Sequence, residues 1–332
     1  MRAPAFWWQT PGVASALLAP FGALYGAVAA ARLKQPGAKP GLPVVCVGDP
    51  TLGGADKTPT AIALAKLLAA AGERPCFLTR GYGGRERGPL LVDPAVHDAD
   101  AVGDEALLLA RAASTVVAAD RVAGAQFAAR TKPTVLVLDD GFQNPALAKD
   151  FSLLVIDGSA GVGNGRVFPA GPLRAPLEAQ IEKAQALVLN GRGPAGEAVA
   201  TIAARKGVPV FAAKIFPEPS TSKKLAGQRV LAFAGIGRPE KFFRTLAEIG
   251  ALVAEQRAFG DHHRYSSAEA RELVAAAKAR NFILATTEKD QARMAGAEDL
   301  AALHAASVAL PIVVEFEDSA ALLQRVRGAI KR

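Results

Sequence analysis

The fold is decided by the stretch Gly48-Asp49-Pro50-Thr51-Leu52-Gly53-Gly54-Ala55-Asp56-Lys57-Thr58-Pro59. It follows the apolar run Pro43–Val47 and precedes the helical pattern Thr60–Ala71. A strand, a glycine-containing loop, Lys-Thr and a helix in this order are typical of a phosphate-binding loop. We expect backbone N–H groups and the helix N-terminus to receive phosphate oxygens. Lys57 would then reach the β and γ phosphates, and the Thr58 hydroxyl would bind Mg²⁺.

The strict phosphate-loop pattern fails at two positions. Thr51 replaces its first glycine, and Asp56 replaces the glycine directly before the lysine. A carboxylate at Asp56 adds negative charge beside the phosphates, which costs electrostatic energy. Lys66 and Arg85 are candidates for a compensating cation, although the sequence does not place either of them near Asp56.

Short apolar runs alternate with amphipathic stretches from Leu42 onward. Continuous apolar runs indicate strands that are buried on both faces, and therefore a parallel sheet covered by helices. The sequence predicts a doubly wound α/β domain of the phosphate-loop NTPase type, whose ligands bind at the carboxyl ends of the strands. The predicted strands are Pro43–Val47, Pro75–Thr79, Thr115–Ala118, Thr134–Leu138, Ser152–Ile156, Ala186–Leu189 and Pro209–Ala213. The predicted helices include Thr60–Ala71, Glu105–Ala112 and Arg121–Ala129.

A second strand–helix pattern begins after the polar stretch Ser220–Lys224. It predicts a smaller α/β domain at residues 223–300 that closes over a first domain at residues 41–222, with an N-terminal helix in residues 1–40. The strand Pro311–Glu315 and the helix Ser319–Ile330 would form a C-terminal segment, residues 301–332, that returns to the first domain. The other predicted elements are Val230–Phe233, Pro239–Ile249, Ala268–Ala279 and Phe282–Thr286.

Composition narrows the classes of partner. The chain has 332 residues, half of them hydrophobic, and a formal net charge of +8, which suits an anionic ligand or surface. Two cysteines provide neither a disulfide framework nor a zinc cluster. Aromatic residues are not interleaved with basic ones, so we expect no nucleic-acid binding.

The N-terminal stretch carries no charge between Arg2 and Arg32. Its strongest apolar residues recur at three- and four-residue steps, so that Leu17, Phe21, Leu24 and Val28 would share one helical face. We favour an amphipathic helix at a membrane interface, followed by basic residues that contact phosphates. A signal peptide and a helix packed on the protein's own core are the alternatives.

Four further motifs follow predicted strands or open predicted helices. Asp139-Asp140 ends a strand, where a nucleoside triphosphatase holds Mg²⁺ opposite its phosphate loop. Asp104 opens a helix, either as an N-cap or as a base that accepts a hydroxyl proton. The segment Asp261-His262-His263-Arg264-Tyr265 would let a carboxylate orient an imidazole at a cleft between domains. Thr287-Glu288-Lys289-Asp290 follows another strand.

Taken together in order, these segments resemble one family, the tetraacyldisaccharide 4'-kinases of lipid A biosynthesis. The resemblance covers nearly the whole chain. The matching stretches are Pro4–Trp8, Gly53–Pro59, Arg80-Gly81-Tyr82-Gly83-Gly84, Gly103-Asp104-Glu105, Asp120-Arg121, Asp139-Asp140-Gly141-Phe142-Gln143, Gly163-Asn164-Gly165-Arg166, Pro169–Arg174, Asp261-His262-His263 and Thr287–Asp290.

The resemblance implies transfer of the ATP γ-phosphate to the 4'-hydroxyl of a tetraacylated glucosamine disaccharide 1-phosphate, giving lipid IV A. It implies ATP and Mg²⁺ as cofactors. It also implies that the protein acts at the anionic cytoplasmic face of the bacterial inner membrane, as a peripheral or monotopic protein. It tips the interpretation of the N-terminal helix toward membrane association without a span.

Site residues carry over by matching position. The resemblance implies a triphosphate site at Thr51, Leu52, Gly53, Gly54, Ala55, Asp56, Lys57 and Thr58, and a metal site at Thr58, Asp139 and Asp140. It implies Asp104 as the base, His262 as its helper and Asp261 as the residue that orients His262. The implied contacts to substrate or transition-state phosphate are Arg80, Arg121, Asn164, Arg166 and Arg174.

Three positions depart from the family, which ordinarily has glycine at Asp56, asparagine at Asp49 and histidine at Asn144. We expect Asp56 to reduce ATP affinity or turnover. Two alternatives follow: a phosphate-loop switch ATPase that phosphorylates no lipid, and a degenerate member that binds the lipid without catalysis.

Overall fold

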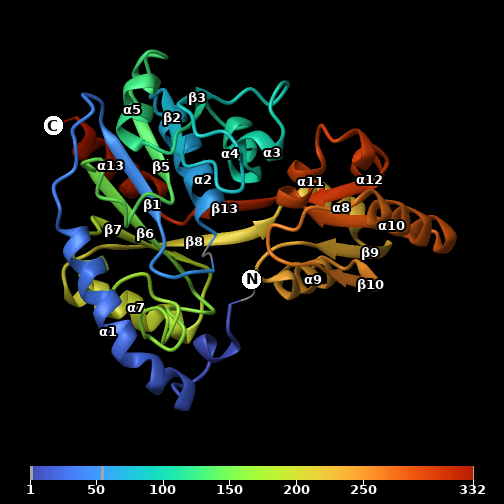
Figure 1. The fold of residues 1–332 in the computed structure, drawn as a ribbon, viewed down its shortest axis with the longest axis horizontal. Coiled ribbons are helices and arrows are strands. Elements are labelled where there is room, and N and C mark those ends of the chain that lie inside the picture. The colour runs from blue at the N-terminus through green and yellow to red at the C-terminus, as the bar shows by residue number, and fades with distance from the viewer. Residues whose placement is uncertain (1–2, 54–55, 332) are drawn as a thin grey trace.

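The computed structural model describes residues 3–53 and 56–331 of the chain (Figure 1). Gly54 and Ala55, two of the predicted nucleotide-binding residues, lie outside the described residues. Two lobes, each built on its own sheet, lie side by side in the ribbon view (Figure 1).

The larger lobe contains a nine-stranded sheet within the described residues, in the order β13-β8-β7-β6-β1-β5-β2-β4-β3. Neighbouring strands run parallel, except that β13 and β3 lie antiparallel to β8 and β4. The central strands are β1 (Val44–Gly48), β5 (Val135–Asp139), β2 (Pro75–Thr79) and β6 (Phe151–Asp157). The others are β3 (Leu90–Leu91), β4 (Thr115–Val117), β7 (Ala186–Asn190), β8 (Val210–Pro217) and β13 (Ile312–Phe316).

Helices cover both faces of this sheet because its strands are apolar on both sides. Val45 and Val47 of β1 face a core formed with α2 (Lys57–Ala70), α4 (Asp104–Ala110) and α13 (Ser319–Ile330). Val44 and Cys46 face the opposite core, formed with α5 (Arg121–Ala129), α6 (Leu177–Ile181) and α7 (Pro194–Arg205). The predicted doubly wound α/β fold is confirmed.

The smaller lobe has a parallel four-stranded sheet in the order β10-β9-β11-β12. Its strands are β9 (Arg229–Ala234), β10 (Leu252–Ala258), β11 (Ile283–Thr287) and β12 (Ser307–Leu310). One face packs on α8 (Pro219–Leu225) and α9 (Pro239–Glu248). The other packs on α10 (Ser267–Arg280), α11 (Glu288–Met294), the 3₁₀ turn η2 (Glu298–Leu300) and α12 (Ala301–Ala306). β10 and β12 were not among the predicted strands, and β10 is an exposed edge strand that lacks an apolar run.

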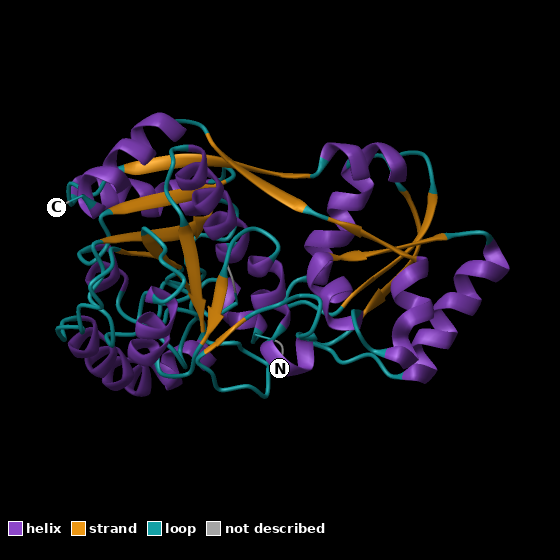
Figure 2. Ribbon diagram, turned by 90° about the horizontal axis from the view of Figure 1, so that it is seen from above, coloured by secondary structure: helices purple, strands orange, loops and turns teal. Residues whose placement is uncertain are grey.

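Two adjacent strands connect the lobes. β8 leads from the larger sheet into α8, and β13 brings the chain back from β12 (Figure 2). β8 pairs with β13, and the Glu218 N–H donates to the Pro311 carbonyl at 2.9 Å. The C-terminal strand and helix therefore pack on the first sheet, whereas β12 belongs to the second.

The chain begins with the turn η1 (Ala5–Trp8) and the long helix α1 (Val13–Leu33), and α3 (Ala99–Val102) precedes α4. Small residues of α1 face the protein: Ser15, Gly22 and Gly26 are buried against residues 167–176. A Cβ at Gly22 would lie 2.8 Å from the Val167 carbonyl oxygen, so glycine permits this close approach. The large apolar residues of α1 face outward instead.

Candidate active site

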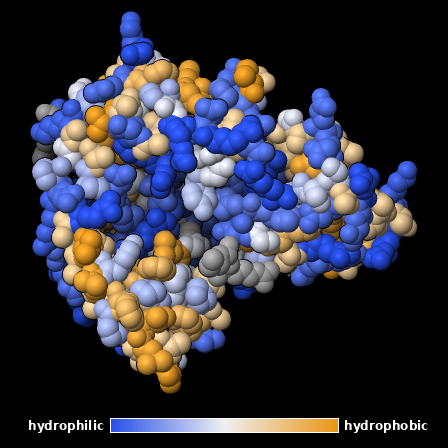
Figure 3. All heavy atoms as spheres, viewed as in Figure 1, coloured by the Kyte–Doolittle hydropathy of each residue, from blue (hydrophilic) through white to orange (hydrophobic). Residues whose placement is uncertain are grey.

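A cleft of about 1450 Å³ lies between the two lobes, at the carboxyl ends of the central strands. Figure 3 shows the hollow with hydrophilic side chains around it. Residues of the phosphate loop, of β5 and of the second lobe line it together, and so does the end of α1. The cleft therefore brings the predicted phosphate-loop residues together with predicted residues of the second lobe, Asp261 and His262.

The phosphate loop is held by hydrogen bonds to residues 172–174. The Leu52 N–H donates to the Pro172 carbonyl at 2.8 Å, and the Arg174 N–H donates to the Pro50 carbonyl at 2.8 Å. The Arg174 guanidinium also donates to the Thr51 carbonyl at 3.0 Å. Of the predicted triphosphate residues, Leu52, Gly53, Asp56, Lys57 and Thr58 line the cleft, and Thr51 is buried behind it.

Two cations meet two carboxylates beside this loop. The Lys57 ammonium lies 2.9 Å from Asp140 and 3.3 Å from Asp49, and Arg174 lies 3.3 Å from both carboxylates. Burial works against a charged Asp140, but Lys57 and Arg174 hold its pKa at about 2. Burial raises the pKa of Asp49, which Lys57 and Arg174 oppose. Asp140 is thus bound to Lys57 and Arg174 through one of its oxygens.

The other two residues of the predicted metal site are Asp139 and Thr58. The Thr58 hydroxyl donates to Asp139 Oδ2 at 2.9 Å. The other oxygen, Oδ1, is buried and has no hydrogen-bond partner among the described residues. Burial raises the pKa of Asp139 to about 7, and nearby Glu105 adds to this. A buried carboxylate oxygen beside a hydroxyl fits a hard cation such as Mg²⁺.

Other oxygen ligands would have to complete that metal site. The described residues contain no group of three or more His, Cys, Asp or Glu side chains able to hold a metal ion. Mg²⁺ is commonly held by one or two carboxylates together with substrate phosphates and water. Thr58 and Asp139 therefore fit a metal that arrives with a nucleotide.

Asp104 lies at the start of α4, directly before Glu105, which lines the cleft near Asp139. One of its oxygens accepts the Glu105 N–H at 2.9 Å, and the other accepts Arg293 Nε at 2.8 Å. His262 Nδ1 lies 3.5 Å from that second oxygen. Burial opposes ionisation, yet His262, Lys289 and Arg293 hold the pKa of Asp104 far below its usual value. Asp104 in turn raises the pKa of His262.

Cations of the second lobe surround Asp104 and Glu105. The Lys289 ammonium lies 2.6 Å from Glu105, and Arg293 is fixed by Asp290 at 3.0 Å. Asp261 lies 3.9 Å from His262 Nε2, and the Tyr82 ring meets the imidazole edge-on. Sequence reasoning missed Glu105, Lys289 and Arg293 as partners of Asp104 and of each other. Glu105 and Lys289 lie within recognised sequence motifs, whereas no sequence pattern pointed to Arg293.

The predicted substrate residues divide into two groups. Arg80, Arg121 and Arg174 line the cleft. Asn164 and Arg166 do not, and Arg166 is exposed. The Asn164 side chain donates to the Ala170 carbonyl at 3.0 Å and to the Phe6 carbonyl at 3.3 Å, so it ties the N-terminal segment to the loop. A substrate role for Asn164 and Arg166 stays a prediction.

The outward face of α1 is apolar. Val13, Leu17, Phe21, Leu24 and Val28 are 55–78% exposed, as the shared helical face predicted. By length and composition, Val13–Leu33 is long and apolar enough to cross a membrane, and a sixth of its most apolar window is buried. The end of α1 reaches the cleft at Val28 and Arg32. This face is consistent with peripheral membrane association.

Comparison with known proteins gives concordant results. A family model described as Tetraacyldisaccharide-1-P 4'-kinase matches residues 14–331. The tetraacyldisaccharide 4'-kinase of Methylobacterium nodulans is 53% identical over 99% of this chain and 96% of its own length. That of Rhodopseudomonas palustris is 50% identical over 99% of this chain and 98% of its own. The crystal structure of LpxK from Aquifex aeolicus in complex with ATP is 28% identical and covers 95% of this chain and 99% of that one, with a TM-score of 0.74.

Proposed function

The chain belongs to the tetraacyldisaccharide-1-P 4'-kinase family, and from this premise we infer that it is a lipid A 4'-kinase. It transfers the γ-phosphate of ATP to the 4'-hydroxyl of a tetraacylated glucosamine disaccharide 1-phosphate, forming lipid IV A. The observation that supports this is one cleft lined both by a Lys-Thr phosphate loop and by His262, whose imidazole pairs with the buried carboxylate of Asp104.

In the proposed mechanism, the phosphate-loop end holds the triphosphate. Lys57 and Arg174 exchange their contacts with Asp49 and Asp140 for phosphate oxygens and neutralise the charge that develops during transfer. Thr58 and Asp139 would hold Mg²⁺, which neutralises charge on the phosphate oxygens. Arg80 and Arg121, which line the cleft beside this end, are available to the transferred group or to the lipid 1-phosphate.

Asp104 orients the attacking hydroxyl and takes its proton. The 4'-oxygen forms a bond to the γ-phosphorus, the bond to the ADP oxygen breaks, and the hydroxyl proton passes to Asp104. A carboxylate of low pKa is a weak base, so its main contribution is orientation until late in the transfer. His262 stabilises the charged carboxylate, while Asp261 orients His262.

The apolar face of α1 brings this cleft to the membrane. The acyl chains of the substrate stay in the bilayer, and α1 would lie in the interface with Arg32, Lys34 and Lys39 near anionic headgroups. We place the protein at the cytoplasmic face of the inner membrane, since ATP is its phosphate donor. Leu17→Asp combined with Leu24→Asp should release the protein from vesicles of anionic phospholipid and leave its affinity for ATP unchanged.

Transfer of labelled phosphate tests the function. The assay supplies γ-labelled ATP, Mg²⁺ and tetraacyldisaccharide 1-phosphate in mixed micelles to wild type, Lys57→Ala and Asp104→Ala. Labelled lipid from wild type alone supports the proposal. Hydrolysis of ATP without labelled lipid would favour a switch ATPase, and lipid binding without nucleotide binding would favour a degenerate member.

A further inference from the structure

The phosphate loop carries a carboxylate where its pattern requires glycine. Asp56 adopts the left-handed conformation, with φ 58° and ψ 40°, that a glycine would supply and that Asp tolerates better than most residues. Its carbonyl accepts the Thr60 N–H at 3.1 Å and the Thr60 hydroxyl at 2.8 Å. The first turn of α2 is therefore formed as usual, and the added negative charge remains to be balanced.

The balancing cation comes from the second lobe. The ammonium of Lys241, in the first turn of α9, lies 2.7 Å from Asp56 Oδ2. Both residues line the cleft, and their side chains are 38% and 26% exposed, respectively. Neither Lys66 nor Arg85, the candidates from the sequence, pairs with Asp56 among the described residues. An ion pair between lobes thus reaches the residue directly before Lys57.

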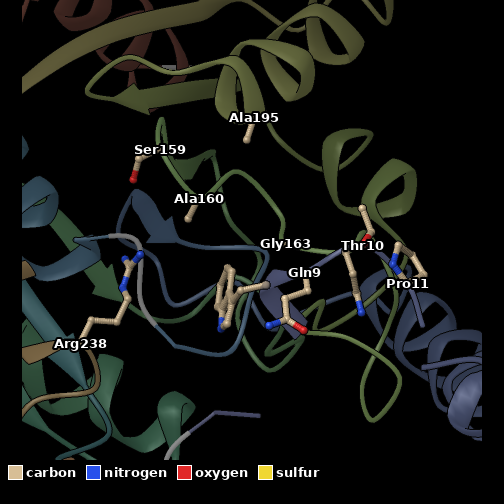
Figure 4. Close-up of a pocket in the computed structure, with 10 residues that line it drawn as sticks. Gln9, Thr10, Pro11, Ser159, Ala160, Gly163, Ala195 and Arg238 are labelled. Carbon is tan, nitrogen blue, oxygen red and sulfur yellow. The ribbon is translucent and has the colours of Figure 1, made fainter. Parts of the chain in front are cut away.

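A second carboxylate anchors the same end of α9. Asp157, at the end of β6, accepts Arg238 at 2.8 Å and lies 3.6 Å from Lys241. Its other oxygen accepts the Ser159 N–H and hydroxyl, so its direction is fixed. Figure 4 shows Arg238 extending from the second lobe toward the loop that carries Ser159, beside a cavity of about 570 Å³. Asp157 therefore holds Lys241 above the phosphate loop.

We propose that Lys241 is a positioning residue for ATP, which keeps the phosphate loop able to bind a triphosphate although the loop carries Asp56. The proposal rests on the proposed function, because it concerns the binding of ATP. Lys241 neutralises the Asp56 carboxylate, so the triphosphate approaches a neutral pair rather than a second anion. Since Lys241 belongs to the second lobe, full affinity for ATP requires α9 to be docked on the loop.

A double-mutant cycle isolates this pairing from other roles of Lys241. The variants are Lys241→Ala, Asp56→Gly and both together, and the readouts are the Kd of ATP with Mg²⁺ and the KM and kcat for labelled lipid. We expect Lys241→Ala to raise Kd and KM about tenfold and to change kcat by less than about twofold. In the Asp56→Gly background, the same change should alter Kd by less than about twofold.

Two further variants keep the test specific. Lys241→Arg preserves the charge and should return Kd to within about threefold of wild type. Lys224→Ala removes an exposed lysine of α8 that does not line the cleft and should leave Kd and melting temperature unchanged. The melting temperatures of all variants verify that the compared proteins are folded.

Either of two results would overturn the proposal. One is a loss of ATP affinity on Lys241→Ala that is equally large in the wild-type and the Asp56→Gly backgrounds, which would make Lys241 a direct phosphate ligand or a structural residue. The other is no loss of affinity in the wild-type background. A wild-type protein that binds ATP but labels no lipid would contradict the proposed function instead, and the cycle would still be readable from Kd.

Discussion

The proposed function assigns two neighbouring groups of residues, a nucleotide end around Lys57 and an acceptor end around Asp104, and these are built in different ways. At the nucleotide end, Lys57 and Arg174 pair with Asp140, and Thr58 donates to Asp139, all within the first lobe. At the other end, first-lobe carboxylates are held by second-lobe cations. The difference indicates that the nucleotide end is built mainly by the first lobe, with Lys241 and Arg238 as its second-lobe contacts. At the acceptor end, by contrast, the cations that hold Asp104 and Glu105 come from the second lobe.

The largest expected effect separates the two ends directly. Lys57→Ala should lower kcat about a thousandfold and weaken ATP binding at least about tenfold, because the main countercharge to the phosphates is lost. Asp104→Ala should lower kcat about a hundredfold or more and leave the Kd of ATP within about twofold. Calorimetric ATP binding beside the labelled-lipid assay checks both. Weakened ATP binding in Asp104→Ala would show that Asp104 also contributes to nucleotide binding, against the proposed division of roles.

Arg293→Ala should be the most damaging change to stability at the acceptor end. The Arg293 side chain is almost fully buried and pairs with both Asp104 and Asp290. Its loss leaves two buried carboxylates without this cation and should lower the free energy of unfolding by about 3 kcal/mol. Urea unfolding measures this, with Arg293→Lys as the control that keeps the charge. Equal stability of Arg293→Ala and wild type would show that the pairing is not structural.

The same contrast explains what the sequence could predict. A phosphate loop is a local signal, since strand, loop, Lys-Thr and helix are contiguous, and Asp139 follows an apolar strand that must lie in the same sheet. Asp104 and His262 could be placed in one site only through the family resemblance, because they lie 158 positions apart in the sequence. Arg293 and Lys241 were beyond prediction. Each forms an ion pair with a residue of the other lobe, and no local sequence pattern identifies such a distant partner.

The pH dependence of stability tests the pairing of His262 with Asp104, and its expected effect is smaller than that of Arg293→Ala. Asp104 raises the pKa of His262 above the usual 6.5, while Asp261 adds to this and Lys289 opposes it. Asp104 itself stays charged throughout. The pairing therefore stabilises the fold fully below pH 6.5 and is lost as pH rises through the raised pKa.

Melting curves of wild type and His262→Gln measure that contribution. The wild type should be more stable by about 1 kcal/mol near pH 5.5, and the gap should shrink as pH rises through the raised pKa of His262. A gap that widens with rising pH would contradict the assigned charge states.

The smallest effect is expected at the rim. Arg264 pairs with Asp100 at 3.2 Å across the lobes, but both side chains are more than half exposed. Arg264→Ala should change the free energy of unfolding by less than about 1 kcal/mol and leave kcat within about twofold, since solvent screens exposed pairs. Denaturant unfolding and the labelled-lipid assay suffice to check it. A large loss of kcat would mean that the exposed Arg264–Asp100 pair, rather than the buried ion pairs of Asp104, fixes how the two lobes dock.

Single-turnover phosphate transfer, measured beside ATP affinity in Arg174→Ala and His262→Ala, tests the division between the two ends most directly. Arg174→Ala should weaken ATP binding about tenfold, because a first-lobe countercharge is lost. His262→Ala should leave the Kd of ATP within about twofold and slow transfer from the bound nucleotide about a hundredfold. Loss of ATP affinity in His262→Ala as large as that in Arg174→Ala would contradict a nucleotide end built mainly by the first lobe.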